Sequence, residues 1–202
     1  MLNIKKFIAG PIETNTYIVY DDKKKGFIID PGFPCQELLD FIKKEKLKIE
    51  FILITHGHFD HVCFVSDLQE KTGAQIAMSE NDIKMMEQSH AWSGKQMGYE
   101  YKYFAPDLLL EDGDIIKAGK IQMRVIATPG HSRGGLCFYM EDEKILFSGD
   151  TIFAGAVGRT DLPFSSEEEI WKSIKEKLFV LPDEVKVFPG HGKETTIRQE
   201  RR

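Results

Sequence analysis

Apolar and polar residues divide the first part of the chain into short strands and one amphipathic helix. Alternating segments at residues 3–8 and 15–20 flank a glycine–proline turn and predict a pair of strands. A third strand is expected at 26–30, where an Asp-Pro-Gly sequence ends it. Over 34–46, apolar residues on one face oppose a row of lysines, which predicts a helix.

The same alternation continues to the end of the chain. The apolar run 51–54 predicts a buried strand, and a helix is expected from His61 to about Lys71. A strand at 75–78 precedes a helix that Ser79 caps. Further strands are expected at 121–127, 135–140, 144–147 and 185–188; Ser165 or Ser166 caps a helix with glutamates three residues on, and the charged tail 194–202 is expected to be frayed.

No flexible linker interrupts this order of strands and helices. We therefore expect residues 1–202 to form a single α/β domain, in which two mixed β-sheets pack together and helices cover the outer faces. The irregular stretch 89–106 is rich in aromatic residues. It is interpreted as a substrate lid, a dimer contact or a satellite core, because a loop of this length is often functional.

Metal-ligating residues follow the predicted strands. The run 51–54 is followed within a few positions by His56, His58, Asp60 and His61. Other apolar strands end near further candidates, namely Asp30, His131, Asp150 and His191. Five of the six histidines lie beside glycines at strand ends, and only His90 falls in the aromatic loop. Imidazole and carboxylate are the usual ligands of zinc and related metals, so we expect these strand ends to meet at a metal centre.

Seven candidate ligands suit two metal ions better than one. They give each ion three or four protein ligands with a shared carboxylate, and leave positions for water and substrate. Two adjacent cations can lower the pKa of a shared water, which provides hydroxide at neutral pH and predicts hydrolysis of an ester, thioester, amide or phosphoester. Asp60 and Asp150 are candidate catalytic residues. Asp30 is expected to orient a histidine or brace the cluster, or to cap the Pro31-Gly32 turn.

Composition narrows the remaining classes of function. The net charge of −5 argues against nucleic acid as the main partner. The chain has no apolar run of about 18 residues, so we expect no membrane span. The N-terminus lacks a secretory pattern and the three cysteines lack metal-site spacing, which together favour a cytoplasmic protein. Structural roles are expected for these cysteines, although Cys63 lies close to the histidine cluster.

The order His56-x-His58-x-Asp60-His61, then His131, Asp150 and His191, resembles the metallo-β-lactamase superfamily over nearly the whole chain. The resemblance implies an αββα sandwich with a dinuclear site. One metal would take His56, His58 and His131, the other would take Asp60, His61 and His191, and Asp150 would bridge them. The true β-lactamases commonly differ at the bridging position, so a lactam substrate is not expected.

Several short motifs look like glyoxalase II and its short bacterial relatives. They are Asn15-Thr16-Tyr17, Ile29-Asp30-Pro31-Gly32, Thr128-Pro129-Gly130-His131-Ser132 and Ser148-Gly149-Asp150-Thr151. This resemblance implies hydrolysis of S-2-hydroxyacyl-glutathione thioesters. The chain departs from that family in two ways. It ends soon after His191, without the helical extension that helps to bind glutathione. It also has Gly158-Arg159-Thr160-Asp161 where the family tends to have Gly-Lys-Phe-Tyr.

Arg159 is our candidate for substrate binding, because its guanidinium could hold a carboxylate; a structural pair with Asp161 is the alternative. The Gly-Arg-Thr-Asp string resembles the persulfide dioxygenases of the same superfamily, which hold one iron with two histidines and an aspartate. Mononuclear iron chemistry is therefore one alternative function, and another metallo-hydrolase such as a lactonase is a second. Two divalent ions are expected as cofactors, with zinc favoured and iron or manganese possible. The expected partner is a small-molecule thioester, and the residues leave the oligomeric state open.

Overall fold

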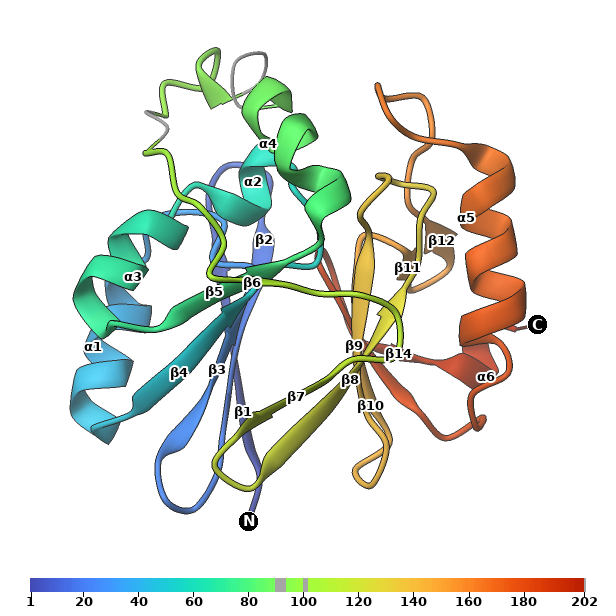
Figure 1. The fold of residues 1–202 in the computed structure, drawn as a ribbon. Coiled ribbons are helices and arrows are strands. Elements are labelled where there is room, and N and C mark those ends of the chain that lie inside the picture. Colours follow the sequence, from blue (N-terminus) through green and yellow to red (C-terminus); the bar gives the residue numbers. More distant parts are fainter. Residues whose placement is uncertain (90–93, 100–101, 202) are drawn as a thin grey trace.

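The protein forms four layers in which two β-sheets pack face to face and helices cover both outer faces (Figure 1). The computed structural model describes residues 1–89, 94–99 and 102–201. The termini lie apart, and the helices α1, α3 and α4 lie on one side while α5 lies on the other. This arrangement is the predicted αββα sandwich, so the fold class is confirmed.

The first sheet comes from the N-terminal half and has the strand order β1-β2-β3-β4-β5-β6. The first three strands are antiparallel neighbours, and β3 to β6 run parallel. The strands are β1 (Asn3–Ala9), β2 (Thr14–Tyr20), β3 (Lys25–Ile29), β4 (Lys48–Leu53), β5 (Gln75–Met78) and β6 (Leu108–Leu109). The parallel strands β3 and β4 therefore deliver their C-terminal ends to one edge of the sheet.

The second sheet comes from the C-terminal half and has the strand order β14-β13-β10-β9-β8-β7. Among its described strands, β10 and β13 are parallel neighbours and the other pairs are antiparallel. The strands are β7 (Ile115–Ala118), β8 (Ile121–Ala127), β9 (Leu136–Met140), β10 (Ile145–Gly149), β13 (Lys186–Pro189) and β14 (Thr195–Thr196). A separate two-stranded ribbon pairs β11 (Ile152–Phe153) with β12 (Ala156–Val157).

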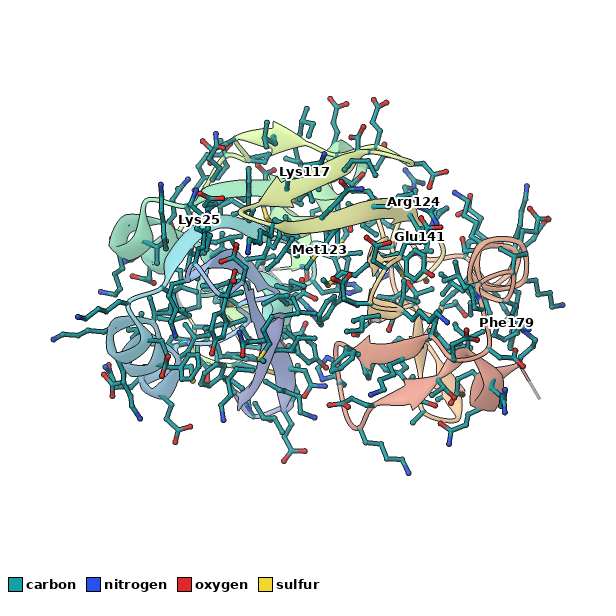
Figure 2. The ribbon with its side chains drawn as sticks, turned by 90° about the horizontal axis from the view of Figure 1, so that it is seen from below. Lys25, Lys117, Met123, Arg124, Glu141 and Phe179 are labelled. Atoms are coloured by element: carbon teal, nitrogen blue, oxygen red, sulfur yellow. The ribbon has the colours of Figure 1, made fainter. Side chains whose placement is uncertain are left out.

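Strands covered on both faces explain why the sequence shows continuous apolar runs instead of strict alternation. In β2, Tyr17 and Val19 face the core between the sheets, whereas Ile18 and Tyr20 face the outer helices. Met123 of β8 lies between the two sheets when the molecule is seen from below (Figure 2). A third cluster fills the space between the second sheet and α5.

The helices follow the predicted amphipathic segments. They are α1 (Gln36–Glu45), α2 (Phe59–Val62), α3 (Val65–Thr72), α4 (Ile83–Ser89), α5 (Glu167–Ser173) and α6 (Ile197–Glu200), with a 3₁₀ turn η1 (Glu80–Asp82) and a π-helical turn η3 (Ile174–Leu178). The predicted caps are present, because Ser79 Oγ accepts a hydrogen bond from the Asn81 amide and Ser166 Oγ accepts one from Glu169. The single helix expected over 61–71 is instead two helices, α2 and α3.

The prediction of a frayed C-terminal tail is wrong. Thr195 pairs with Val187 of β13, and α6 follows directly. Ile197 is fully buried against the second sheet, and the Thr196 hydroxyl caps α6 by accepting a hydrogen bond from the Gln199 amide. The pairing of Thr195 with β13 and the burial of Ile197 in the cluster beside α5 together anchor this segment.

The aromatic stretch 89–106 is described only in part. Phe104 is buried in the cluster under the first sheet's helices, and the Tyr99 ring lies 4.8 Å from Phe33. These two contacts match the satellite-core interpretation, whereas Tyr103 is largely exposed. The predictions that involve His90, Trp92 and Tyr101 fall outside the described residues.

Candidate metal centre

Loops from both sheets bring the predicted ligands together at one edge of the sandwich. His56, His58 and His131 form one group whose ligand atoms lie within 4.8 Å of one another; we name it the three-histidine cluster. Asp60, His61 and His191 form a second such group, the mixed cluster. The N-terminal half supplies two residues to each cluster and the C-terminal half supplies one. The site therefore exists only where the two halves meet.

Asp150 lies between the two clusters, directly after β10. Its Oδ2 is 3.6 Å from Nε2 of His131 and 3.6 Å from Nε2 of His191, and its Oδ1 is 3.5 Å from Nε2 of His61. Two ligands on one tetrahedral zinc at about 2.1 Å are separated by about 3.4 Å. These spacings are those expected of atoms that share a cation, and one carboxylate reaches donors in both clusters.

Asp30 forms a third group of possible ligands with His56 and His61, but hydrogen bonds already engage both of its oxygens. Its Oδ1 accepts the Thr55 amide at 2.7 Å, and its Oδ2 accepts the Thr55 hydroxyl at 2.6 Å. Because the Thr55 hydroxyl donates there, its oxygen accepts from Nδ1 of His56 at 3.0 Å. Nδ1 of His61 donates to Oδ2 of Asp30 at 3.0 Å. One carboxylate thus fixes a histidine in each cluster, and its oxygens are occupied by these donors.

Backbone carbonyls fix two further histidines in the same way. Nδ1 of His131 donates to the Arg159 carbonyl at 2.9 Å, and Nδ1 of His191 donates to the Ile12 carbonyl at 3.0 Å. Because each Nδ1 is used in this way, Nε2 is the ring atom that faces the centre. Nε2 of His56 and of His131 and Oδ1 of Asp150 are buried without a hydrogen-bond partner among the described residues. Buried acceptors that face one another in this way fit a bound cation.

The Asn15-Thr16-Tyr17 motif holds the loop that carries His191. The Asn15 side-chain amide donates to the carbonyls of Pro189 and Gly192 at 2.9 and 3.0 Å. The Tyr17 hydroxyl donates to the Pro189 carbonyl at 2.7 Å. Since Asn15 and Tyr17 belong to β2 and the loop follows β13, these bonds connect the two sheets beside the metal centre.

Burial and neighbouring imidazoles keep His56 and His58 of the three-histidine cluster neutral. Burial, together with the nearby His131, lowers the pKa of His58 to about 3. Burial also lowers the pKa of His56 far below its ordinary value, and the other histidines of the site add to this effect. Neutral imidazole is the form that binds a metal, so these rings are ready for a cation at physiological pH.

In the mixed cluster, carboxylates raise the pKa of a histidine, whereas in the three-histidine cluster the pKa values of His56 and His58 are lowered. Burial disfavours the charge on His61, but Asp150, Asp60 and Asp30 outweigh it and raise the pKa of the ring well above normal. Burial would raise the pKa of Asp60, but His61 and a hydrogen bond from His191 hold it well below its ordinary value. The mixed cluster thus attracts positive charge, which a metal ion supplies in place of a proton.

Two glycines leave no room for a side chain beside the ligands. A Cβ on Gly190 would lie 2.2 Å from Oδ1 of Asp150 and 2.7 Å from Cε1 of His61. A Cβ on Gly158 would lie 2.0 Å from the Asp150 carbonyl oxygen. The turn that carries Asp150 is therefore packed directly against the loops on both sides, which restricts its carboxylate to this position.

Asp82 connects the two loops of the three-histidine cluster, and sequence reasoning missed it. This fully buried carboxylate accepts hydrogen bonds from the Gly57 amide at 2.9 Å, the Gly134 amide at 2.6 Å and the Ser132 hydroxyl at 2.7 Å. Gly57 lies between His56 and His58, and Ser132 follows His131. Burial raises the pKa of Asp82 despite these donors. An aspartate in a helix-starting segment gave no sequence signal, because it resembles an ordinary cap.

The Arg159 guanidinium is paired with a carboxylate, and the Cys63 thiol is buried. The Arg159 guanidinium forms two hydrogen bonds of 2.7 Å to the carboxylate of Asp161, and both side chains are exposed. Its role in substrate binding stays a prediction, and would require Asp161 to release the guanidinium.

Burial raises the pKa of Cys63 to about 12, which keeps the sulfur a thiol and unsuited to metal binding.

Fold and site define a class of protein. Residues 9–191 match the model of the Metallo-beta-lactamase superfamily, and the chain belongs to that family, whose members are generally metal-dependent hydrolases. The prediction of the superfamily is confirmed. No helix among the described residues is both long and apolar enough to cross a bilayer.

Curated relatives are similar over nearly their whole length. A protein of Aquifex aeolicus (strain VF5) is 39% identical over 98% of this chain and 93% of its own. Hydroxyacylglutathione hydrolase GloC of Haemophilus influenzae (strain ATCC 51907 / DSM 11121 / KW20 / Rd) is 33% identical, over 100% of this chain and 96% of its own. The probable metallo-hydrolase YqgX of Bacillus subtilis (strain 168) is 34% identical, over 97% and 93%.

Solved structures agree on the fold, although the proteins themselves bear different names. BLEG-1, a B3 metallo-beta-lactamase, has a TM-score of 0.90 and 33% identity, covering 98% of this chain and 96% of its own. TTHA1623 in a di-iron-bound form has a TM-score of 0.88 and 34% identity, covering 98% and 97%. ETHE1 from Myxococcus xanthus has a TM-score of 0.83 and 25% identity, covering 99% and 82%.

Proposed function

We propose that this protein is a hydrolase that uses two divalent metal ions to cleave a thioester, with S-2-hydroxyacyl-glutathione as its substrate class. The position of Asp150 carries the proposal. Its two oxygens lie 3.5–3.6 Å from histidine nitrogens of both clusters, as a carboxylate shared by two cations would. The three-histidine cluster would hold one ion, the mixed cluster would hold the other, and Asp150 would contribute to both.

The protein's own residues supply position and charge. Bound here, two metal ions would supply an activated water and would polarise the carbonyl under attack. Asp30, Thr55 and the carbonyls of Arg159 and Ile12 orient four of the five histidines so that each Nε2 faces the centre. Asp60 and Asp150 would balance the positive charge of the ions. A thiolate is a good leaving group, so its departure needs little help from an acidic side chain.

Three observations support a thioester as substrate. The relative from Haemophilus influenzae bears the name hydroxyacylglutathione hydrolase. The Asn15-Thr16-Tyr17 motif, which the chain shares with the glyoxalase II group, holds the His191 loop through its hydrogen bonds to Pro189. The net charge of −5 disfavours polyanionic substrates such as nucleic acids. We assign the protein to the cytoplasm, where glutathione is abundant, with zinc as the favoured metal over iron or manganese.

A persulfide dioxygenase is the second candidate. The Gly158-Arg159-Thr160-Asp161 string, which resembles that group, favours it. That activity would use one iron held by His56, His131 and Asp150. The similarity to TTHA1623, whose structure was solved in a di-iron-bound form, suits the dinuclear interpretation with iron in place of zinc.

Metal analysis combined with an anaerobic assay tests the proposal. Purified protein is analysed for zinc, iron and manganese, and thiol release from S-lactoylglutathione is followed without oxygen. About two metals per chain with thiol release is the expected result. One iron per chain, with oxygen consumed only when glutathione persulfide is added, would identify the dioxygenase. A chromogenic β-lactam is assayed in parallel because of the similarity to BLEG-1, and we expect little turnover of it.

A further inference from the structure

A small apolar pocket adjoins the three-histidine cluster. It has a free volume of about 60 Å³ and is lined by His58, Met85, Gln88, Ser89, Leu162, Pro163 and Phe164. The residues of α4 form one side, the loop before α5 forms the other, and His58 connects the pocket to the metal centre. This volume is well below that of most small-molecule sites, so it matches a substituent of a substrate better than a whole one.

The pocket is anchored to the ligand-bearing segments. The Ser89 hydroxyl oxygen accepts the Phe59 amide at 3.1 Å, which connects the end of α4 to the start of α2. Asp82, immediately before α4, holds the loops on which His58 and Arg133 lie. The Arg133 guanidinium lies 5.3 Å from the centre of the Phe164 ring. The same hydrogen-bonded segments therefore position both the pocket and the metal centre.

Phe164 adopts a backbone conformation that a phenylalanine rarely takes. Its φ is +69°, in the left-handed region that favours glycine. A phenylalanine that persists there points to a functional constraint, because glycine would relieve the strain. The ring of this same residue lines the pocket and lies against the Arg133 guanidinium. The strained residue is therefore one wall of the pocket.

We propose that this pocket receives the acyl chain of the thioester, and that Phe164 sets the length of chain it accepts. The inference rests on the function proposed above. The described lining residues include no Lys, Arg, Asp or Glu, so the charged groups of glutathione would lose solvation there without a partner. The acyl substituent is uncharged and is bonded directly to the carbon under attack. It therefore lies within reach of His58 whenever the carbonyl is at the metals.

The test compares acyl-chain dependence in wild type, Phe164→Gly and Lys46→Gly. S-acyl-glutathiones from two to eight acyl carbons are assayed for kcat/KM. In wild type, each added methylene raises kcat/KM about fourfold until the pocket is full, after which kcat/KM falls. In Phe164→Gly the rise continues for at least two further carbons, because the wall is removed. Leu162→Ala, on the same loop, shifts the limit in the same direction.

Lys46→Gly is the matched control. Lys46 also has a left-handed backbone, with φ of +54°, but it ends α1 and is exposed. Glycine relieves the same kind of strain there without touching the pocket, so the chain-length dependence should equal that of wild type. Melting temperatures of all variants, measured by circular dichroism, separate effects on folding from effects on the pocket.

A binding series keeps the two proposals distinguishable. Straight-chain carboxylic acids of two to eight carbons are titrated into the metal-loaded protein by calorimetry. If wild type cleaves no thioester, the proposed function fails, while a chain-length limit in binding that Phe164→Gly relaxes still supports the pocket. Identical chain-length dependence in wild type and Phe164→Gly would overturn the pocket assignment. The assignment would also be overturned if the chain-length limit moved with the thiol part of the substrate while the acyl group was held constant, because the pocket would then receive the thiol.

Discussion

The three-histidine cluster and the mixed cluster lie side by side, yet they differ in charge. The first is made of imidazoles, and burial lowers the pKa of His58 to about 3. The second contains Asp60, and three carboxylates raise the pKa of His61 well above normal. His56 and His58 of the first cluster are therefore neutral at neutral pH, whereas His61 of the second cluster attracts a proton. Two sites that would hold the same metal are thus prepared for it in different ways.

The two clusters are alike in how the fold assembles them. Each takes two ligands from the segment after β4 and one from a loop of the second sheet. Asp30 also serves both, through Thr55 to His56 and directly to His61. The comparison shows which residues act on both clusters and which act on one. Substitution of a residue that acts on both clusters should therefore weaken metal binding at both, whereas substitution of a residue in one cluster should weaken that cluster alone.

Asp150→Ala should have the largest effect, because it removes the carboxylate between the clusters. We expect the metal content to fall by about one ion per chain and thioester kcat/KM to fall about a thousandfold, since charge stabilisation by a metal amounts to several kcal/mol. Elemental analysis and steady-state kinetics measure both. Retention of two ions with near-normal turnover would mean that Asp150 does not bridge them.

His58→Ala is the matched variant for a single cluster. It should empty the three-histidine cluster and leave the mixed cluster occupied, with most activity lost and the far-ultraviolet circular dichroism unchanged. His58 is only partly buried, so its removal leaves the core intact. Unchanged turnover would mean that the residue does not belong to the reactive centre.

Asp30→Asn should weaken both clusters, because it alters the acceptor for Thr55 and for His61. We expect metal affinity to fall roughly 10–100-fold, as is typical when a hydrogen-bond partner of a ligand is changed. Thr55→Val removes only the hydroxyl that accepts from His56, so it should weaken the three-histidine cluster alone. Competition with a metal chelator distinguishes the two variants. Equal metal-release profiles for both would contradict the two separate hydrogen-bond paths, one from Asp30 through Thr55 to His56 and one from Asp30 directly to His61.

Asp82→Ala should lower stability and loosen the three-histidine cluster. It leaves two buried amides and a hydroxyl without their acceptor, at a cost of about 3 kcal/mol. For a chain of this size that corresponds to a fall of roughly 6–12 °C in melting temperature. Differential scanning calorimetry of the metal-free protein measures it. Asp82→Asn, which keeps one acceptor oxygen, should recover part of the loss.

Acidification should empty the mixed cluster first. A histidine with a raised pKa keeps its proton in the metal-free protein, and that stabilising proton is lost only as pH rises through the folded-state value. A metal must displace it, so affinity at the mixed cluster falls as pH drops from about 8 toward about 5. His58, with a pKa of about 3, offers no such competition over this range. Metal content measured against pH in wild type and in His58→Ala reveals the order, and simultaneous release would contradict it.

Arg159→Ala should have the smallest effect on the metals. His131 is held by the Arg159 backbone carbonyl, which alanine retains. The exposed pair with Asp161 contributes little to stability. If the guanidinium binds substrate, KM rises more than kcat falls. A loss confined to kcat would place Arg159 in the chemical step instead.

Much of this site could be predicted from the sequence because strand ends are a local property. Each ligand follows an apolar run, and parallel strands such as β3 and β4 deliver their ends to the same edge. The layered fold follows from runs that are apolar on both faces. The tail 194–202 misled the prediction, because only two of its described residues, Thr195 and Ile197, are buried.

The sequence alone determined most of the strands and helices, the types of the candidate ligands and their positions at strand ends. The tertiary structure decided which ligands share a cluster, how Asp30 reaches both clusters, and that Asp82 holds two loops that are distant in the chain. It also decided that the Arg159 guanidinium binds Asp161 and that Phe164 faces a pocket. Local patterns record which side chains are present and which face they occupy. Hydrogen bonds and pKa values depend on distances across the two sheets, and packing alone sets those distances.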